Sequence, residues 1–340
     1  MPSPPPLPLA LFLLCPALTF LARQSAAEQK LSPPAPRRPS SSPPPPASSL
    51  SARGSRSLRP VLSYFPLFLS CLENLASPDN PAGRIPLCVA ENKLVTKGLL
   101  SPRMEKALPS ACANHQAFTY SDMAGLPELR EAAAAFFTAH FKGAVSSSDV
   151  LVGSGGSGLL STAFTLLLSE GDGIIIPAPY YAAFDNDTSV LAGCVPVPLL
   201  SENPAAGPTE QELDACLSRS AAPIRMLLLT NPNNPLGVCY TVEQLEMMIR
   251  WARSRGLHVL VDEVYALSGF GEGGVAFSSA LEVLGGAAGL GEDVHVLYSL
   301  SKDFGASGLR TGFLVTGNEQ VGTYRARSTR SVKLVDSVPW

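Results

Sequence analysis

Short apolar runs alternate with amphipathic stretches of helical period from about Leu151 onward. Seven such runs lie at residues 150–152, 173–177, 195–199, 225–230, 258–261, 294–298 and 312–315. Before and between them, residues 126–139, 158–168 and 241–255 repeat apolar side chains three and four positions apart, as the buried face of a helix does. Runs that are apolar throughout are typical of strands covered on both faces. The alternation predicts an α/β fold, a mostly parallel sheet with helices on both faces.

The composition indicates a large core and a small-molecule ligand. Of the 340 residues, 46% are hydrophobic, and the net charge is −3 with a pI near 5.9. Because the chain has no long run of lysine and arginine, neither nucleic acid nor an anionic membrane surface is an expected partner. The seven cysteines are scattered and form no Cys-x-x-Cys pair. We therefore expect reduced, buried thiols, no disulfide framework and no zinc or other metal site.

Residues 1–60 differ in composition from the rest of the chain. An apolar stretch at 7–21, broken by Pro8 and Pro16, leads into low-complexity sequence rich in proline and serine. Such sequence buries too little surface to offset its ordering entropy. The apolar part is short for a membrane span and lacks the positive start of a secretory signal. Three interpretations stay open: a targeting segment, a weak membrane anchor, and an artefact of the gene boundary.

A lysine follows the apolar run 294–298 almost directly. Residues 298–312 read YSLSKDFGASGLRTG, which places Lys302 among small side chains. A surface lysine is the plain interpretation of an isolated Ser-Lys pair, since most lysines are exposed. At the end of a buried strand, however, a lysine amine can be desolvated and can form a Schiff base. Lys302 is therefore the first candidate catalytic residue.

Three more polar segments adjoin predicted strands. Residues 230–237 read TNPNNPLG, residues 258–265 read HVLVDEVY, and residues 152–158 read VGSGGSG. Taken singly, the first is a turn and the acid of the second, Asp262, is a helix cap. The third opens a helical stretch, where glycines let the backbone approach an anion and free N–H groups point at it. Ligands of open α/β sheets bind beyond the carboxyl ends of strands, so we expect one shared site.

Together these segments resemble the cofactor site of the class I and II aminotransferases. Ser-Leu-Ser-Lys-Asp followed by Gly-x-x-Gly-x-Arg is most similar to the 1-aminocyclopropane-1-carboxylate synthase branch. The resemblance implies the large domain of the fold type I pyridoxal-phosphate transferases and pyridoxal 5′-phosphate as cofactor. It also implies that Lys302 forms the Schiff base and that Asp262 pairs with the pyridine nitrogen, keeping the ring electron-poor.

The same resemblance implies roles for the remaining cofactor-binding residues. Asn234 and Tyr265 would contact the phenolic oxygen, and an aromatic ring, Tyr181 by register or else Tyr180, would stack on the pyridine. Core packing is the alternative for either of these two tyrosines. The residues implied to bind the phosphate, with Arg310 forking onto its oxygens, are Gly156, Ser157, Ser299 and Arg310.

Two segments nearer the N-terminus concern the substrate. Residues 89–94 read VAENKL and resemble the Ala-Glu-Asn motif of the synthases, which implies that Glu91 lies in the substrate pocket; a solvated glutamate is the alternative. Residues 118–130 resemble the family's Tyr-x-x-x-x-Gly-x-x-x-x-Arg segment. Two residues before its glycine, where the synthases place a second tyrosine, this chain has Met123. The substitution weighs against cyclopropane synthesis.

The resemblance extends from about Ile85 to Val321. We expect a low-complexity, targeting-like segment at 1–60, the large domain with an N-terminal arm at 61–323, and an unassigned tail at 324–340. Family members continue with a small domain of roughly a hundred residues that carries the arginine gripping the substrate carboxylate, and we expect this domain to be missing here. The resemblance also implies a homodimer and a cytoplasmic location.

The implied chemistry is removal of an amino acid's α-proton by Lys302. In a transaminase the proton returns to the cofactor, whereas in a cyclopropane synthase the carbanion expels a γ-sulfonium and closes a ring. Both reactions use the same anchor residues, so both interpretations stay open. A protein that binds the cofactor without catalysis is the third interpretation.

Overall fold

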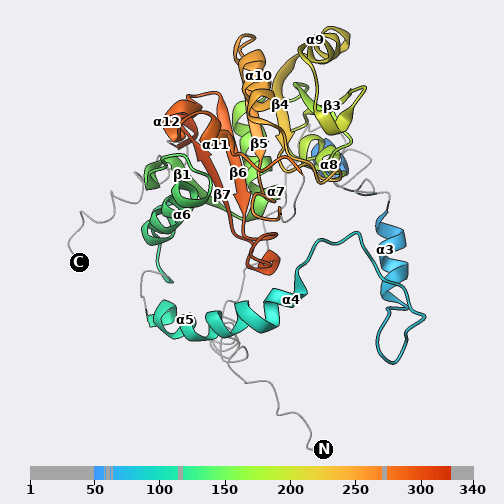
Figure 1. The fold of residues 1–340 in the computed structure, drawn as a ribbon, viewed down its shortest axis with the longest axis vertical. Coiled ribbons are helices and arrows are strands. Elements are labelled where there is room, and N and C mark those ends of the chain that lie inside the picture. Colours follow the sequence, from blue (N-terminus) through green and yellow to red (C-terminus); the bar gives the residue numbers. More distant parts are fainter. Residues whose placement is uncertain are drawn as a thin grey trace, which may run out of the picture. The chain divides into compact units, whose positions relative to one another are not determined.

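A seven-stranded sheet forms the centre of the fold (Figure 1). The computed structural model describes residues 50–56, 58, 62, 64–113, 118–269 and 274–322. The strand order is β1-β7-β6-β5-β4-β2-β3, and every neighbouring pair is parallel except that β7 runs antiparallel to β1 and β6. This arrangement confirms the predicted α/β class with a mostly parallel sheet. The strands are β1 (Val150–Gly153), β2 (Gly173–Ala178), β3 (Val195–Leu200), β4 (Ile224–Thr230), β5 (His258–Asp262), β6 (Val294–Ser299) and β7 (Gly312–Thr316).

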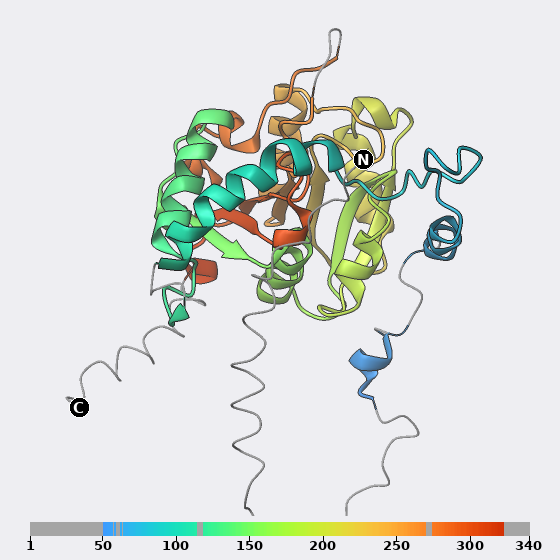
Figure 2. The same ribbon diagram turned by 90° about the horizontal axis from the view of Figure 1, so that it is seen from below.

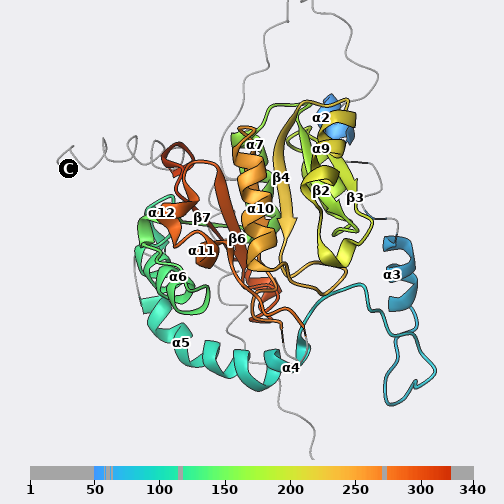
Figure 3. The same cartoon turned by 45° about the horizontal axis from the view of Figure 1, so that its top comes forward.

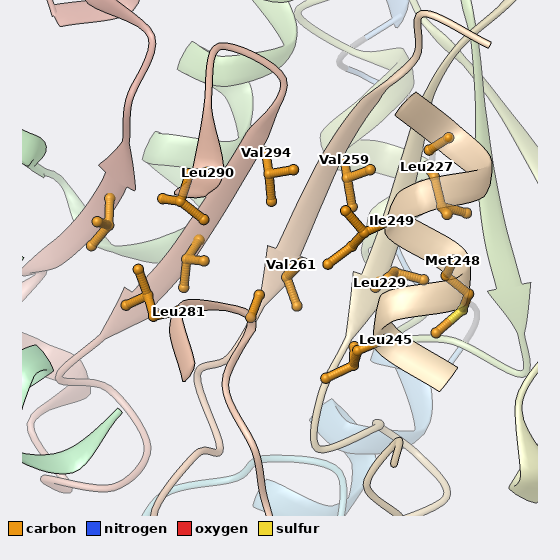
Figure 4. Packing of buried hydrophobic residues seen from close by; sticks show 14 of the residues in the cluster. Leu227, Leu229, Leu245, Met248, Ile249, Val259, Val261, Leu281, Leu290 and Val294 are labelled. Atoms are coloured by element: carbon orange, nitrogen blue, oxygen red, sulfur yellow. The ribbon is translucent and has the colours of Figure 1, made fainter. Parts of the chain in front are cut away.

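The central strands are buried on both faces. On β4, Leu227 and Leu229 belong to the hydrophobic cluster of one face, while Met226 and Leu228 belong to that of the other. All four side chains are fully buried. Figure 4 shows the first cluster, in which helix α10 places side chains such as Ile249 against β4 and β5. A strand with two buried faces has no polar alternation, which is why continuous apolar runs marked these strands in the sequence.

Helices cover both faces of the sheet, as predicted. Helices α6, α9, α10, α11 and α12 contribute to the first cluster, and α7 and α8 contribute to the second; Figure 3 shows α10 and α11 in front of the sheet. Capping boxes in which Thr209 and Thr241 accept backbone N–H bonds define the starts of α9 and α10. The helices are α6 (Pro127–His140), α7 (Gly155–Leu167), α8 (Phe184–Ser189), α9 (Glu210–Arg219), α10 (Val242–Arg253), α11 (Ala280–Val283) and α12 (Ala287–Leu290), with 3-10 turns η4 (Ser147–Asp149), η5 (Pro204–Ala206) and η6 (Ser307–Leu309).

Six of the seven strands continue one residue beyond the predicted apolar run. In β5 and β6 the added residues are Asp262 and Ser299, whose polarity ends the apolar pattern although their backbones still pair. Asp262 pairs with Thr230 of β4, and Ser299 pairs with Gly312 of β7. Because β4, β5 and β6 are parallel, their polar last residues lie along one edge of the sheet. The edge faces the bottom of Figure 1.

Several helices precede the sheet: α2 (Ala52–Arg56), α3 (Phe65–Leu72), α4 (Lys93–Val95), the π-helical turn η2 (Thr96–Leu100) and α5 (Ser101–Ala113) (Figure 2). Helices α3, α4 and α5 and turn η2, all within the described residues, bury no side chain. Most of the predicted targeting or anchor segment, and the predicted tail at 324–340, lie outside the described residues. Within the part that the structure describes, no helix is long and apolar enough to cross a membrane. The two predicted domain boundaries stay predictions.

The cysteines of the described residues differ in burial. Cys194 and Cys216 are buried as predicted, whereas Cys88 and Cys112 are exposed. The prediction of buried thiols is therefore wrong for these two; Cys112 lies on α5, which buries no side chain.

Two histidine rings lie in contact at the opposite edge of the sheet, with centroids 5.4 Å apart. His295 is fully buried, with Nδ1 2.8 Å from Thr316 Oγ1 and Nε2 3.3 Å from His258 Nδ1. Burial lowers the pKa of His295 to about 3 and also lowers the pKa of His258. Both rings therefore stay neutral in the folded state at pH values where the unfolded chain binds protons. Stability that is present above the unfolded pKa of about 6.5 is lost as the pH falls below it.

Replacing His295 with asparagine removes its titration, so we expect the variant to lose about 1.4 kcal/mol less stability per pH unit below pH 6 than the wild type. Urea unfolding at several pH values between 4.5 and 7, chosen around the reference histidine pKa of about 6.5, measures the difference. His140→Asn on the exposed end of α6 serves as the control for replacing a histidine away from this pair. Equal slopes in His295→Asn and the wild type would contradict the assignment.

Candidate active site

A cavity of about 230 Å³ opens at the edge where the parallel strands end. Nine of the ten residues predicted for the site line it, and Glu91 does not. The lining also includes six residues that the sequence did not single out, of which Val264 and Ser301 are direct sequence neighbours of predicted site residues. The residues around the cavity are Gly156, Ser157, Leu160, Tyr181, Phe184, Thr230, Asn234, Asp262, Val264, Tyr265, Ser299, Ser301, Lys302, Ser307 and Arg310.

Lys302 lies on the turn that follows β6, with its side chain half-buried at the cavity. Its Nζ donates a hydrogen bond to the backbone oxygen of Ala90 at 3.2 Å and lies 5.8 Å from the centre of the Tyr265 ring. Burial lowers the pKa of this amine, while the carboxylates of Asp262 and Glu91 act in the opposite direction. A lowered pKa increases the fraction of neutral, nucleophilic amine at neutral pH.

Asp262 ends β5 with its side chain buried. Its Oδ1 accepts one backbone hydrogen bond, from Val264 N at 3.2 Å. Burial raises the pKa of Asp262 to about 7, and that backbone bond and the charge of Lys302 oppose the rise. A buried carboxyl with so little compensation favours a cationic partner in the cavity, because pairing restores the solvation that the carboxylate loses.

Glu263 is a buried acid that sequence reasoning missed. Its carboxylate accepts hydrogen bonds from Ser279 Oγ at 2.6 Å and from Ala280 N at 2.7 Å. Burial raises the pKa of Glu263 to about 8, against these two bonds. Asn231 holds the neighbouring strand in the same way, donating through Nδ2 to Ser278 O at 3.0 Å. Together they join the ends of β4 and β5 to the start of α11. Its position next to Asp262 is the one feature of the sequence that could have drawn attention to Glu263.

The opposite end of the cavity has the features of an anion site. Helix α7 begins there with Gly155, at φ +75°, and a Cβ on Gly155 would lie 2.5 Å from Nη2 of Arg310. Arg310 itself has the left-handed backbone conformation, φ 48°, which is strained for a residue with a side chain. A guanidinium beside the positive end of a helix dipole is unfavourable by itself. A bound anion would contact both groups and remove the repulsion.

Tyr181 and Asn234 line the cavity wall between these two ends. The ring of Tyr181 meets Phe184 edge-on, with centroids 5.4 Å apart. Burial raises the pKa of Tyr181 to about 12, so its hydroxyl stays protonated. Tyr180, the alternative stacking residue, donates its hydroxyl to Asp185 at 2.6 Å and is outside the lining. The geometry therefore favours Tyr181 as the aromatic ring of the site.

The remaining candidates lie farther from the cavity. Glu91 neighbours Ala90, the acceptor of the Lys302 hydrogen bond, and its carboxylate acts electrostatically on Lys302. Its own nearest cation is Lys93, at 3.8 Å. Met123 is 42% exposed and is not part of the lining. Of the substrate-side residues, the structure thus brings Glu91 close to the lysine but outside the cavity.

Comparison with known proteins agrees with the geometry. The family model described as aminotransferase class I and II matches residues 82–336. The 1-aminocyclopropane-1-carboxylate synthase 6 of Arabidopsis thaliana is 34% identical over 290 residues, which are 81% of this chain and 58% of that protein. A probable aminotransferase of Aspergillus oryzae is 33% identical over 281 residues, 79% of this chain and 65% of its own length. The chain thus spans less than two thirds of these relatives.

Solved structures share the fold. The aspartate aminotransferase of Thermotoga maritima superimposes with a TM-score of 0.66 at 24% identity, over 82% of this chain and 70% of that one. The resemblance noted from the sequence is therefore confirmed at the level of the family and of the fold. The chain belongs to the class I and II aminotransferase family, whose members depend on pyridoxal phosphate.

Proposed function

We propose that this chain is an enzyme that holds pyridoxal phosphate through Lys302 and acts at the α-carbon of an amino acid. One observation carries the proposal: the lysine, a buried carboxyl and a helix start beside an arginine share a single cavity. The lysine amine is the nucleophile, and the other two groups are complementary to a ligand with a cationic ring at one end and a phosphate at the other.

The residues present fit this cofactor. The phosphate end is an open cradle, because the lack of a Cβ on Gly155 leaves room beside Arg310 and the N–H groups of α7. The ring end contains Asp262 with its raised pKa. Asp187 on α8 does not line the cavity but acts electrostatically on Asp262, and its Oδ2 is buried without a hydrogen-bond partner among the described residues. Two poorly compensated carboxyls are suited to a ring that carries a proton on nitrogen.

Lys302 has two roles in the proposed reaction. It would attach the cofactor, and its Nζ, once free, would take the α-proton of the substrate. The bound cofactor would supply the electron sink that makes this proton acidic. Asp262 would maintain the ring charge on which that acidity depends, while Asn234 and Tyr265 would contact and orient the ring. Burial keeps water away from the amine and lowers its pKa, so the base is partly neutral at neutral pH.

Between the two reactions of the family, we propose transamination. Met123 supports this choice, because it stands where the synthases place a second tyrosine. The similarity to the probable aminotransferase of Aspergillus oryzae is compatible with it. Glu91, near the lysine, suits either reaction. An assay of amino acids with a keto-acid acceptor beside an assay of S-adenosylmethionine separates the two, and release of a cyclopropane amino acid would overturn the choice.

A cofactor-binding protein without catalysis is the second candidate. A relative of Mus musculus whose name describes it as a probable inactive synthase-like protein is 33% identical over 262 residues. An absorption band that appears with pyridoxal phosphate but does not change with any amino acid would favour this candidate. We also propose a homodimer by family resemblance; the exposed apolar side chains of Leu94 and Leu108 on the N-terminal helices suit a second copy.

Lys302→Ala should abolish covalent attachment of the cofactor, because no other residue of the cavity lining carries a primary amine. Borohydride reduction followed by peptide mass mapping measures the attachment. Loss of the base should also slow α-proton exchange by about a hundredfold or more. Lys142→Ala, which removes a surface lysine paired with Glu282, is the control and should retain the label. A reduced adduct on any other lysine of the wild type would refute the assignment.

Asp262→Asn should keep the cofactor but lose most α-proton exchange, since a neutral amide no longer stabilises the ring charge. The charge-assisted bond is worth about 1.5–3 kcal/mol, so we expect exchange to fall by about ten- to a hundredfold. Proton NMR of an amino acid in deuterated water follows the exchange. Asp185→Asn on the exposed side of α8 is the matched control. Unchanged exchange in Asp262→Asn would show that the carboxylate does not act on the ring.

Gly155→Ala should weaken binding of pyridoxal phosphate about tenfold or more, because the new Cβ strains a positive φ and meets Arg310. Binding of pyridoxal, which lacks the phosphate, should change much less. Gly158→Ala on the same helix, whose Cβ would meet only Ser154 at 3.3 Å, is the control. Titration of the visible absorption measures both ligands. An equal loss for the two would mean that Gly155 acts through the fold and not through the phosphate.

A further inference from the structure

We propose that Asp303 is a positioning residue that holds the turn carrying Tyr265 against the loop carrying Lys302. The inference rests on the proposed function of these two residues. Asp303 follows Lys302 directly and is half-buried. It does not line the cavity, so it acts on the site only through its neighbours.

Three hydrogen bonds converge on the Asp303 carboxylate. Leu267 N donates to Oδ2 at 3.0 Å, Ser268 Oγ donates to Oδ1, and the Tyr298 hydroxyl donates to Oδ2 at 2.9 Å. Leu267 and Ser268 belong to the turn of Tyr265, and Ser268 N closes this turn on Tyr265 O at 2.9 Å. The carboxylate therefore connects a turn after β5, a loop after β6, and β6 itself.

Tyr298 gives the carboxylate a rigid anchor. Its ring is fully buried and meets Phe137 and Phe141 edge-on, with centroids 5.9 Å and 5.3 Å away. Burial and the neighbouring Asp303 charge raise the pKa of its hydroxyl, which therefore stays a donor at any physiological pH. A side chain held this way cannot follow a moving loop, so Asp303 is fixed relative to the sheet.

The connection matters because Tyr265 and Lys302 lie on different strands' loops. Two hydrogen bonds link the turn at 264–269 to the loop at 300–311, and both are accepted by Asp303. The other hydrogen bonds of the lysine loop do not reach this turn: Lys302 Nζ donates to Ala90 O at 3.2 Å, and Gly305 N donates within the loop to Lys302 O at 2.9 Å. The spacing of the tyrosine from the lysine amine, 5.8 Å from ring centre to Nζ, therefore depends on this one carboxylate.

Three variants separate positioning from mere stability. Asp303→Ala removes the acceptor oxygens of all three hydrogen bonds. Asp303→Asn can keep three bonds, because its oxygen can accept from Leu267 N and Tyr298 while its amide donates to the Ser268 hydroxyl, which is able to accept. Asp214→Ala is the matched control: it removes hydrogen bonds from Trp251 Nε1 at 2.9 Å and Arg255 Nη2 at 2.6 Å, none of which lines the cavity.

The first measurement needs no cofactor. Amide hydrogen exchange of the 264–269 turn should be about tenfold faster in Asp303→Ala than in the wild type, because the turn is released. Asp303→Asn and Asp214→Ala should keep the wild-type rate there. Equal exchange rates of this turn in Asp303→Ala and the wild type would show that the carboxylate does not hold the turn.

The second measurement uses the holoprotein. In Asp303→Ala the dissociation constant of pyridoxal phosphate should rise about tenfold. The pH midpoint of the cofactor's visible absorption should move up by about half to one unit, since the tyrosine hydroxyl no longer favours the deprotonated form. Asp303→Asn should stay near the wild type, and Asp214→Ala should lower only the melting temperature.

The outcomes are distinct from those that test the proposed function. If Asp303→Ala has a lower melting temperature but keeps the wild-type pH midpoint of the visible absorption, Asp303 only stabilises the fold, and the inference is overturned. Equal shifts of this midpoint in Asp303→Ala and Asp303→Asn would show that the charge of Asp303 causes the effect, and would also overturn the inference. If the wild type itself shows no absorption band with pyridoxal phosphate, the proposed function fails, while hydrogen exchange still decides whether Asp303 holds the turn.

Discussion

The candidate site depends on the burial of charged groups at the edge where β4, β5 and β6 end. Parallel pairing brings these ends together, and the last residue of β5 is a carboxylic acid in a position with little access to water. Burial raises the pKa of Asp262 and lowers that of Lys302 on the next loop. Asp262 is the strongest compensation for the charge of Lys302, and Lys302 adds to the backbone hydrogen bond of Val264 in compensating Asp262. The two strand ends are thus linked electrostatically as well as through the ladder.

Both ends of the cavity lack full compensation in the chain itself. At one end Asp262 accepts a single backbone hydrogen bond, and at the other Arg310, in a strained left-handed conformation, faces the start of α7. Such features destabilise the folded state by a few kcal/mol together. A ligand with a positive ring and a negative phosphate compensates both ends at once and stabilises the fold by mass action. The strain is therefore best understood as preorganisation for that ligand.

The sequence predicted the parts of this arrangement that follow from local patterns. Seven apolar runs became seven strands, and the lysine, asparagine and aspartate segments lie at one edge because parallel topology requires it. The pattern ended one residue early on β5 and β6, since Asp262 and Ser299 are polar although they pair in the ladder. The start of α7 was placed three residues late for a related reason: its glycines have little helix propensity but adopt the helix beside Arg310.

Contacts between distant segments were beyond the reach of such patterns. Glu263 follows the apolar run 258–261 and Asp262 in the sequence, whereas its hydrogen-bond partners Ser279 and Ala280 lie sixteen and seventeen residues later. Asp303 receives its bonds from a turn about thirty-five residues earlier. Glu263 joins the two ends of the segment between β5 and α11, and Asp303 holds the turn of Tyr265 within it. Both acids restrict the position of Tyr265, as is required of a residue whose hydroxyl is to meet a ligand in a fixed place.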